Sequence, residues 1–250
     1  MLVVVSPAKK LDMDPVAGVQ PTQPMFPERT RELVTEAAKL TSGELEKLMK
    51  ISPNLAKLNQ QRFSDFGSQN RKPAAFAFAG DTFQGLEVAT LDADALRWAQ
   101  EHLRILSGLY GVLRPLDEIE PYRLEMGSRL KTEHGKNLYE YWGSELALEL
   151  STQAKTTKST AVINCASQEY FQAVDTRSLA VPVISPVFME NTEKGPKIIS
   201  FYAKRARGAM ARFVVSNRIA TPAELCDFDA GGYRYEPDLS SENKPVFLRG

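Results

Sequence analysis

The chain has 250 residues, of which 31 are Lys or Arg and 31 are Asp or Glu, so its formal net charge at pH 7 is zero. With 43% hydrophobic and 25% charged residues, the composition is globular, which excludes a disordered, collagenous or low-complexity chain. Net neutrality excludes a protein held to polyanions by bulk charge, so any such binding must come from a local patch. The two cysteines, Cys165 and Cys226, form no disulfide framework and no CxxC pair, which suits a reducing compartment.

The chain carries no recognisable targeting or membrane signal. Its apolar start, Met1–Val5, is too short for the core of a signal peptide, and no basic segment precedes it. No apolar run approaches the roughly 18 residues that a membrane helix needs. We therefore expect a cytoplasmic protein that does not associate with membranes.

Short β-branched or aromatic runs predict buried strands, and amphipathic patterns between them predict helices. The expected strands are Leu2–Ser6, Ala74–Ala79, Arg104–Leu109, Ala161–Asn164, Val181–Phe188 and Lys197–Phe201. The expected helices are Thr30–Leu40, Gly43–Lys50, Pro53–Phe63, Asp92–His102, Leu138–Ser151 and Tyr202–Val214. This interspersed order predicts a mixed α/β (α+β) fold, as a single domain over residues 1–250 with a central mixed sheet and surrounding helices.

Polar loops follow three of the predicted strands, beginning with Ser6–Asp12 after the first. Because ligands favour the loops beyond the carboxyl ends of strands, Ser6, Lys9 and Asp12 can hold an anion or take part in proton transfer. The other two loops are Gly80–Gly85 and Asn164–Phe171. Together the three can converge into one cleft, although each alone is better explained as a cap or turn.

Residues 44–63 resemble a helix-hairpin-helix motif of non-specific DNA-binding proteins. One helix is expected to end near Lys50, and Ser52 is placed to cap the next, with Pro53 in its first turn. In that motif two glycines let the turn present backbone N–H groups to a phosphate, whereas here Lys50 and Ser52 occupy the glycine positions. Two helices packed as a purely structural hairpin explain the segment equally well.

Charge is unevenly distributed, and the last predicted helix is the most basic element. Residues 197–218 contain six basic and no acidic residues, whereas residues 219–242 contain six acidic residues and one basic residue. On a helical wheel Lys204, Arg205, Arg207 and Arg212 share one side, with the small Gly208 and Ala211 between them. Small residues there would let a phosphate backbone approach closely, although a solvated helix face is the alternative.

Several common chemistries lack their motifs here. The only histidines, His102 and His134, have no ligand spacing to a second His or Cys, so we expect no zinc or other metal site. Cys165 has no context of a catalytic thiol and is expected to be a buried, inert one. The sequence contains no GxGxxG, Walker or GxSxG motif, and no cofactor is expected.

An ordered series of motifs resembles the YaaA family of bacterial peroxide-stress proteins. The matching stretches are Ser6–Asp12, Gly80–Leu86, Ile105–Asp117, Pro121–Gly127, Ala166–Phe171, Tyr202–Met210, Gly232–Tyr233 and Val246–Arg249. Gln168 and Cys165 depart mildly from the family pattern. The resemblance implies a cytosolic protein that limits iron-dependent damage under peroxide stress, with a mixed α/β fold, a helix-hairpin-helix and a positively charged DNA-binding cleft.

The leading hypothesis is a DNA-binding stress protein that contacts the phosphates of double- or single-stranded DNA with little sequence specificity. Its predicted contact residues are Lys9, Lys10, Lys50, Lys57, Lys204, Arg205, Arg207 and Arg212. The hypothesis requires these distant cations to meet on one concave face. No obligate protein partner is evident, and an enzyme is the less favoured class.

Two other functions stay open at this point. The first is an enzyme acting on a nucleotide-like or phosphorylated substrate, or on damaged nucleic acid. Its cleft would collect Ser6, Lys9, Asp12, Glu169, Tyr170, Lys204 and Arg207, of which Lys9, Asp12, Glu169 and Tyr170 are the catalytic candidates. The second is direct iron sequestration, for which the sequence offers no strong cluster of carboxylates or histidines.

Overall fold

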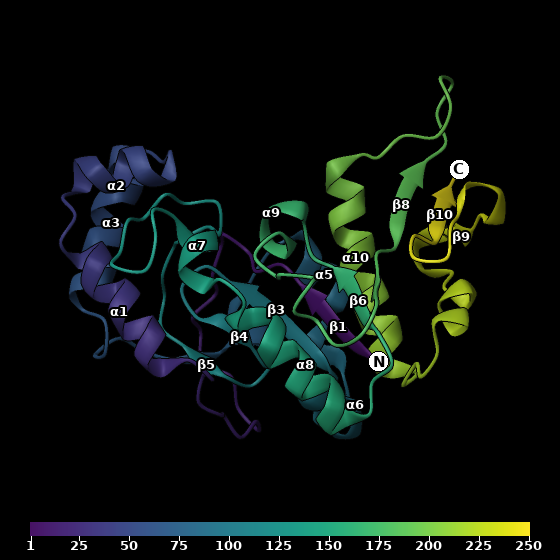
Figure 1. Ribbon diagram of the computed structural model, residues 1–250, viewed down its shortest axis with the longest axis horizontal. Helices are drawn as coiled ribbons and strands as arrows, with labels where there is room; N and C mark the ends of the chain where they lie inside the picture. Colours follow the sequence, from purple (N-terminus) through teal and green to yellow (C-terminus); the bar gives the residue numbers. More distant parts are fainter.

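A computed structural model describes residues 1–250 and has a mixed α/β fold built on a five-stranded sheet (Figure 1). The sheet has the order β4-β3-β1-β6-β7, and only β3 and β4 run antiparallel. Its strands are β1 Leu2–Val5, β3 Leu103–Ser107, β4 Gly111–Leu113, β6 Val162–Cys165 and β7 Val183–Ile184. The predicted fold class is confirmed.

The central strand β1 explains why its sequence is a continuous apolar run. Successive strand side chains point to opposite faces, yet all four residues of β1 are fully buried, so both faces of the sheet are covered there. Helix α8, Glu145–Thr157, packs against β1 and β4, whereas α10, Ser200–Ser216, packs against β1 and β6. Helix α6, Ala93–His102, leads directly into β3 and contacts both of these helices.

The remaining strands form two smaller sheets. The first has the order β8-β10-β9 and, with the turns around it, forms a lobe at one end of the molecule (Figure 1). Its strands are β8 Val187–Glu190, β9 Arg234–Tyr235 and β10 Val246–Arg249. The second pairs β2, Lys72–Pro73, with β5, Glu118–Ile119. No helix of the structure is long and apolar enough to cross a lipid bilayer.

Three consecutive helices lie at the opposite end of the molecule from this lobe (Figure 1). They are α1 Pro27–Ala38, α2 Ser42–Met49 and α3 Pro53–Ser64. These agree with the predicted helices to within a few residues. The remaining short helices are α4 Ala74–Ala77, α5 Asp81–Leu86, η1 Val88–Thr90, α7 Leu138–Trp142, α9 Gln168–Phe171, η2 Pro222–Asp227, η3 Ala230–Gly232 and η4 Pro237–Leu239.

Some predicted elements are wrong, and each error has a local cause. The predicted strand Ala74–Ala79 begins with helix α4, since its alanines suit a buried helical turn as well as a strand. The run Lys197–Phe201 contributes one β-bridge at Lys197 and then enters α10. The predicted loop Gly80–Gly85 lies almost entirely within α5.

Two predicted elements are divided. The predicted strand Val181–Phe188 contributes to β7 and β8, which belong to different sheets. The predicted helix Leu138–Ser151 is broken into α7 and α8 at Gly143, whose positive φ of 48° is a conformation that glycine adopts without steric cost. The expectation of a single domain remains a prediction.

Candidate functional site

Helices α2 and α3 form a tight hairpin whose turn is Lys50-Ile51-Ser52. Thr41 and Glu44 form a capping box at the start of α2, and Ser52 caps α3 by accepting a hydrogen bond from the Leu55 N–H. Lys50 ends α2 in the left-handed conformation, with φ 52° and ψ 54°, and its N–H bonds the carbonyl of Glu46. Lysine therefore adopts here the backbone conformation that a glycine favours.

The turn of this hairpin presents free donors and positive charge to solvent. The backbone N–H groups of Ser52 and Asn54, at the start of α3, have no hydrogen-bond partner in the protein, and both residues are exposed. Lys50 and Lys57 beside them are also exposed and form no ion pair. Unpaired N–H groups at a helix N-terminus, with the helix dipole behind them, favour an anion such as phosphate.

The second basic element, α10, packs closely on α5. A methyl group at Gly208 would overlap the carbonyl oxygen of Thr82, and one at Gly85 would overlap that of Arg205. Ala211 is fully buried. The expectation that Gly208 and Ala211 leave room for a phosphate backbone is therefore wrong: the small residues make room for a helix instead.

Because α5 packs against α10, the four cations of α10 have different surroundings. Lys204 and Arg205 are exposed and have no ion pair or hydrogen bond within the protein. Arg207 is half-buried, its Nε donates to the Ala203 carbonyl at 3.3 Å, and burial lowers the pKa of its guanidinium. Arg212 donates from one guanidinium nitrogen to the carbonyls of Leu86 and Glu87, and so caps the end of α5.

The two lysines of the first loop differ in their partners. Lys9 pairs with Glu125 across 3.5 Å, although its side chain is 67% exposed. Lys10 is exposed and unpaired. Of the eight predicted DNA contacts, Lys9 is thus the only one in an ion pair, and the charge of the other seven is not neutralised by a contacting carboxylate.

Strand-end loops do converge at the carboxyl ends of β1 and β6. The Ser6 hydroxyl accepts the Ser167 N–H at 2.8 Å and donates to the Ser167 hydroxyl at 3.2 Å. Glu169 accepts the Gly127 N–H at 3.1 Å, and burial raises the pKa of Tyr170. Cys165, at the end of β6, is buried, which raises the pKa of its thiol to about 12.

Lys9 and Tyr170 line one small cavity of about 10 Å³ together with Glu125. One oxygen of Glu125 accepts from Arg123 at 2.9 Å and faces Lys9, while Oε2 is buried without a hydrogen-bond partner. A buried carboxylate oxygen without a hydrogen-bond donor is uncommon in proteins, because burial removes its hydrogen bonds to water and nothing replaces them. We call Lys9, Arg123, Glu125 and Tyr170 the strand-end cluster.

The predicted strand-end cleft and the observed strand-end cluster differ at Asp12 and Glu125. Asp12 was predicted to line the same cleft as Lys9, but its carboxylate pairs with the buried Lys72 at 3.2 Å and also accepts the Asp14 N–H. Glu125 is a member that the sequence did not predict as a site residue. Its partner Lys9 is distant in the chain, so the only available signal was its place in the motif Pro121–Gly127.

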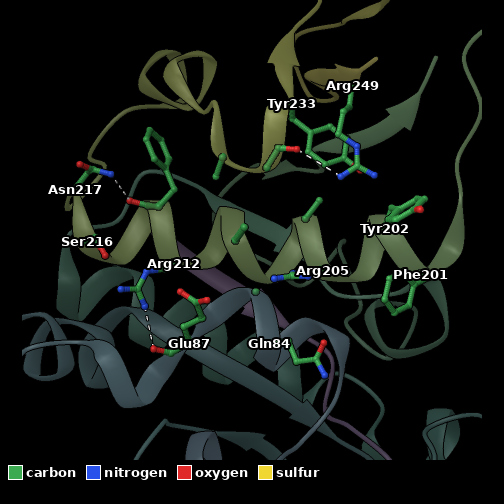
Figure 2. A pocket seen from close by; sticks show the side chains of 16 residues that line it. Gln84, Glu87, Phe201, Tyr202, Arg205, Arg212, Ser216, Asn217, Tyr233 and Arg249 are labelled. Carbon is green, nitrogen blue, oxygen red and sulfur yellow. Dashed lines mark hydrogen bonds between the residues drawn. The ribbon is translucent and has the colours of Figure 1, made fainter.

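Lys50 and Arg207 lie in different parts of the molecule. The hairpin of α2 and α3 lies near one end, whereas α10 lies beside the β8–β10 lobe (Figure 1). Arg205 and Arg212 line a groove of about 630 Å³ between α10, α5 and this lobe (Figure 2). Lys204 and Arg207 do not line it, and neither does the hairpin. The eight predicted contact residues therefore do not all meet on one concave face.

Comparisons with known proteins identify close relatives over the whole chain. Residues 1–239 match the family model described as peroxide stress protein YaaA. The chain is 56% identical over 253 residues to a UPF0246 protein of Ruegeria pomeroyi, with 100% of this chain and 98% of the relative covered. It is 57% identical over 255 residues to a UPF0246 protein of Roseobacter denitrificans, with the same coverage. A UPF0246 protein of a Jannaschia species is 54% identical over 251 residues, with 100% and 97% covered.

Proposed function

The chain belongs to the peroxide stress protein YaaA family, and from this premise we propose that it binds DNA through the phosphate backbone with little sequence specificity. The hairpin of α2 and α3 is the principal contact. It acts as a helix-hairpin-helix in which Lys50 adopts the left-handed conformation of the missing glycine. Contacts to phosphate fix the position of a protein on DNA without reading its sequence.

The observation that carries this proposal is the combination of free donors and free charge at the turn. The N–H groups of Ser52 and Asn54 are unpaired, and Lys50 and Lys57 are exposed beside them. A phosphate bound there receives backbone hydrogen bonds and charge from one rigid hairpin. Lys10 and Lys204, both exposed and unpaired, are candidates for contacts further along the strand. Lys9 and Arg207 join them less readily, because one is paired and the other half-buried.

Charge reversal in the hairpin tests this function. Lys50→Glu with Lys57→Glu should weaken binding to duplex DNA by roughly a factor of ten or more, equally for duplexes of unrelated sequence. The matched control is Lys155→Glu with Lys158→Glu, which reverses two exposed, unpaired lysines at the C-terminal end of α8. Equal affinities of the hairpin variant and the control would remove the hairpin from the interface.

Protection against iron-dependent damage follows from the same contacts. Ferrous ions gather in the counterion layer of DNA, and lysines that neutralise phosphates release condensed counterions. Bound protein therefore moves iron away from the DNA surface. Plasmid nicking by ferrous iron and peroxide should fall when the protein is added, and Lys50→Glu with Lys57→Glu should abolish the protection. Protection that survives in this variant would separate the stress role from DNA binding.

A second candidate function is an enzyme acting on a nucleotide-like or phosphorylated substrate, or on damaged nucleic acid. The observation that favours it is the strand-end cluster, where Glu125 keeps a buried oxygen unpaired beside Lys9 and Tyr170. The cavity there is small, so the pair of Lys9 and Glu125 must open to admit a substrate. A turnover screen with nucleotides and damaged DNA tests it: product that disappears in Lys9→Ala and Glu125→Gln supports catalysis, and no product dismisses it.

A further inference from the structure

The groove along α10 has the size of a small-molecule site. Its walls are the C-terminal end of α5 on one side and Tyr233 and Arg249 of the lobe on the other (Figure 2). Its volume of about 630 Å³ lies within the range of roughly 300–1,000 Å³ that is usual for ligand pockets. We call it the α10 groove. Neither the hairpin nor the strand-end cluster lines it, so it is a separate surface.

The α10 groove offers guanidinium groups with unused donors. Arg205 forms no hydrogen bond and no ion pair, and Figure 2 shows it between α10 and α5. Arg212 uses a single nitrogen to hold the end of α5, which leaves its other donors free. Glu87 is the one acidic residue of the lining. The charge of Arg249 is already matched by Glu190 at 2.7 Å. An anion is therefore the ligand that Arg205 and Arg212 favour.

Exposed aromatic rings stand at one end of the same groove (Figure 2). The side chains of Phe201 and Tyr202 are 52% and 41% exposed, and their rings meet edge to face at 5.5 Å. The Arg249 guanidinium covers the Tyr202 ring at 4.4 Å. Phe201 has no such cover. An exposed aromatic ring beside free arginines is the combination that binds nucleotides, with the base stacked and the phosphate paired.

The spacing along the helix fits one ligand. Phe201 and Arg205 are four residues apart, so they lie on one face with a rise of about 6 Å between them. Arg212 follows on the same face, about 10 Å further along the helix axis than Arg205. We propose that the α10 groove binds a nucleoside phosphate, with the base stacked on Phe201 and the nearest phosphate held by Arg205, while Arg212 contacts a second phosphate where the ligand has one. The ligand is a free nucleotide or the unpaired end of a nucleic-acid strand, because both carry this chemistry.

Calorimetric titration of the full-length protein with adenosine monophosphate, inorganic phosphate and a single-stranded oligothymidylate tests the proposal. Phe201→Ala and Arg205→Gln should each weaken nucleotide binding by roughly a factor of ten. Phosphate alone should respond to Arg205→Gln and not to Phe201→Ala. Matched controls on α8 are Leu148→Ala, which removes another exposed apolar side chain, and Lys155→Gln, which removes another exposed cation. Circular dichroism melts verify that each variant is folded.

The ligand that binds more tightly identifies the source, either the free nucleotide or the nucleic-acid strand. The proposal is overturned if neither adenosine monophosphate nor the oligothymidylate saturates the protein, or if both variants bind as the wild type does. The hairpin variant Lys50→Glu with Lys57→Glu should keep its nucleotide affinity. Loss of duplex binding and loss of nucleotide binding are therefore separate results, and each proposal fails on its own.

Discussion

The two closely packed helix pairs of this protein, α2 with α3 and α5 with α10, are held together in different ways. The first pair consists of neighbours in the chain joined by a three-residue turn, and its caps are local. The second joins helices more than a hundred residues apart, through Gly85 and Gly208, in the body of the fold. The first pair leaves its turn exposed to solvent, while the second supports the sheet and shapes the α10 groove.

The largest expected effect comes from filling the contact between α5 and α10. In Gly208→Ala the new methyl group overlaps the Thr82 carbonyl, which is backbone and can move only with the whole of α5. The free energy of unfolding should fall by about 3 kcal/mol, measured by urea denaturation. A decrease below about 1 kcal/mol would mean that the two helices separate easily, contrary to their close approach at Gly208.

Gly43→Ala is the corresponding change in the other helix pair, and it should raise the free energy of unfolding where Gly208→Ala lowers it. Gly43 lies in α2, where an added methyl group would have no atom within 4 Å, and alanine favours a helix more than glycine does. Urea denaturation should show a gain of about 0.5–1 kcal/mol. A lower stability would show that the hairpin is constrained by contacts other than its own turn and caps.

This difference explains why the sequence predicted the pair α2 and α3 better than the pair α5 and α10. Ser52, Pro53 and the end of α2 near Lys50 are local signals, and the structure confirms them. Gly208 is ambiguous in the sequence, because a glycine on a helix admits a ligand or another helix equally well. Its partner Thr82 is far away in the chain, so no local pattern could decide between the two.

The same reasoning applies to the candidate site. Lys9 and Tyr170 were both predicted as cleft residues because they follow strands, and they do line one cavity. The loops after adjacent parallel strands meet at one edge of the sheet. Glu125 was missed as a site residue because its role depends on a long-range contact and on burial. The sequence alone identified the cations of α10. Which of them line the α10 groove depends on how α5 packs against α10, and no local pattern shows that.

Lys50→Gly separates the fold of the hairpin from its proposed function. Glycine adopts the left-handed conformation of Lys50 without steric cost, so the free energy of unfolding should rise by roughly 0.5–1 kcal/mol. The same variant has one cation fewer, and its affinity for duplex DNA should fall. Urea denaturation and DNA titration measure the two effects. A variant that is more stable and binds DNA as before would show that Lys50 does not touch phosphate.

The smallest expected effect is a pH dependence in the half of the molecule that contains α10. His102 ends α6, which contacts α10, and its ring stacks on Trp98 at 3.8 Å. Burial lowers the pKa of His102 below its ordinary value of 6.5, so the unfolded chain binds the proton more readily. The free energy of unfolding should be highest above pH 6.5 and fall as the pH drops through that value toward the lower folded pKa. Urea denaturation across this range should give a flatter profile for His102→Gln, and an identical profile would exclude His102 as the cause.

The most direct test of the proposed DNA binding is the salt dependence of duplex affinity, compared between the wild type and Lys50→Glu with Lys57→Glu. A plot of log affinity against log salt should be steep for the wild type. Its slope should decrease by about 0.9 for each phosphate that the protein no longer neutralises, hence by about 2 in the variant. A slope that is the same in both proteins would contradict phosphate binding by the hairpin.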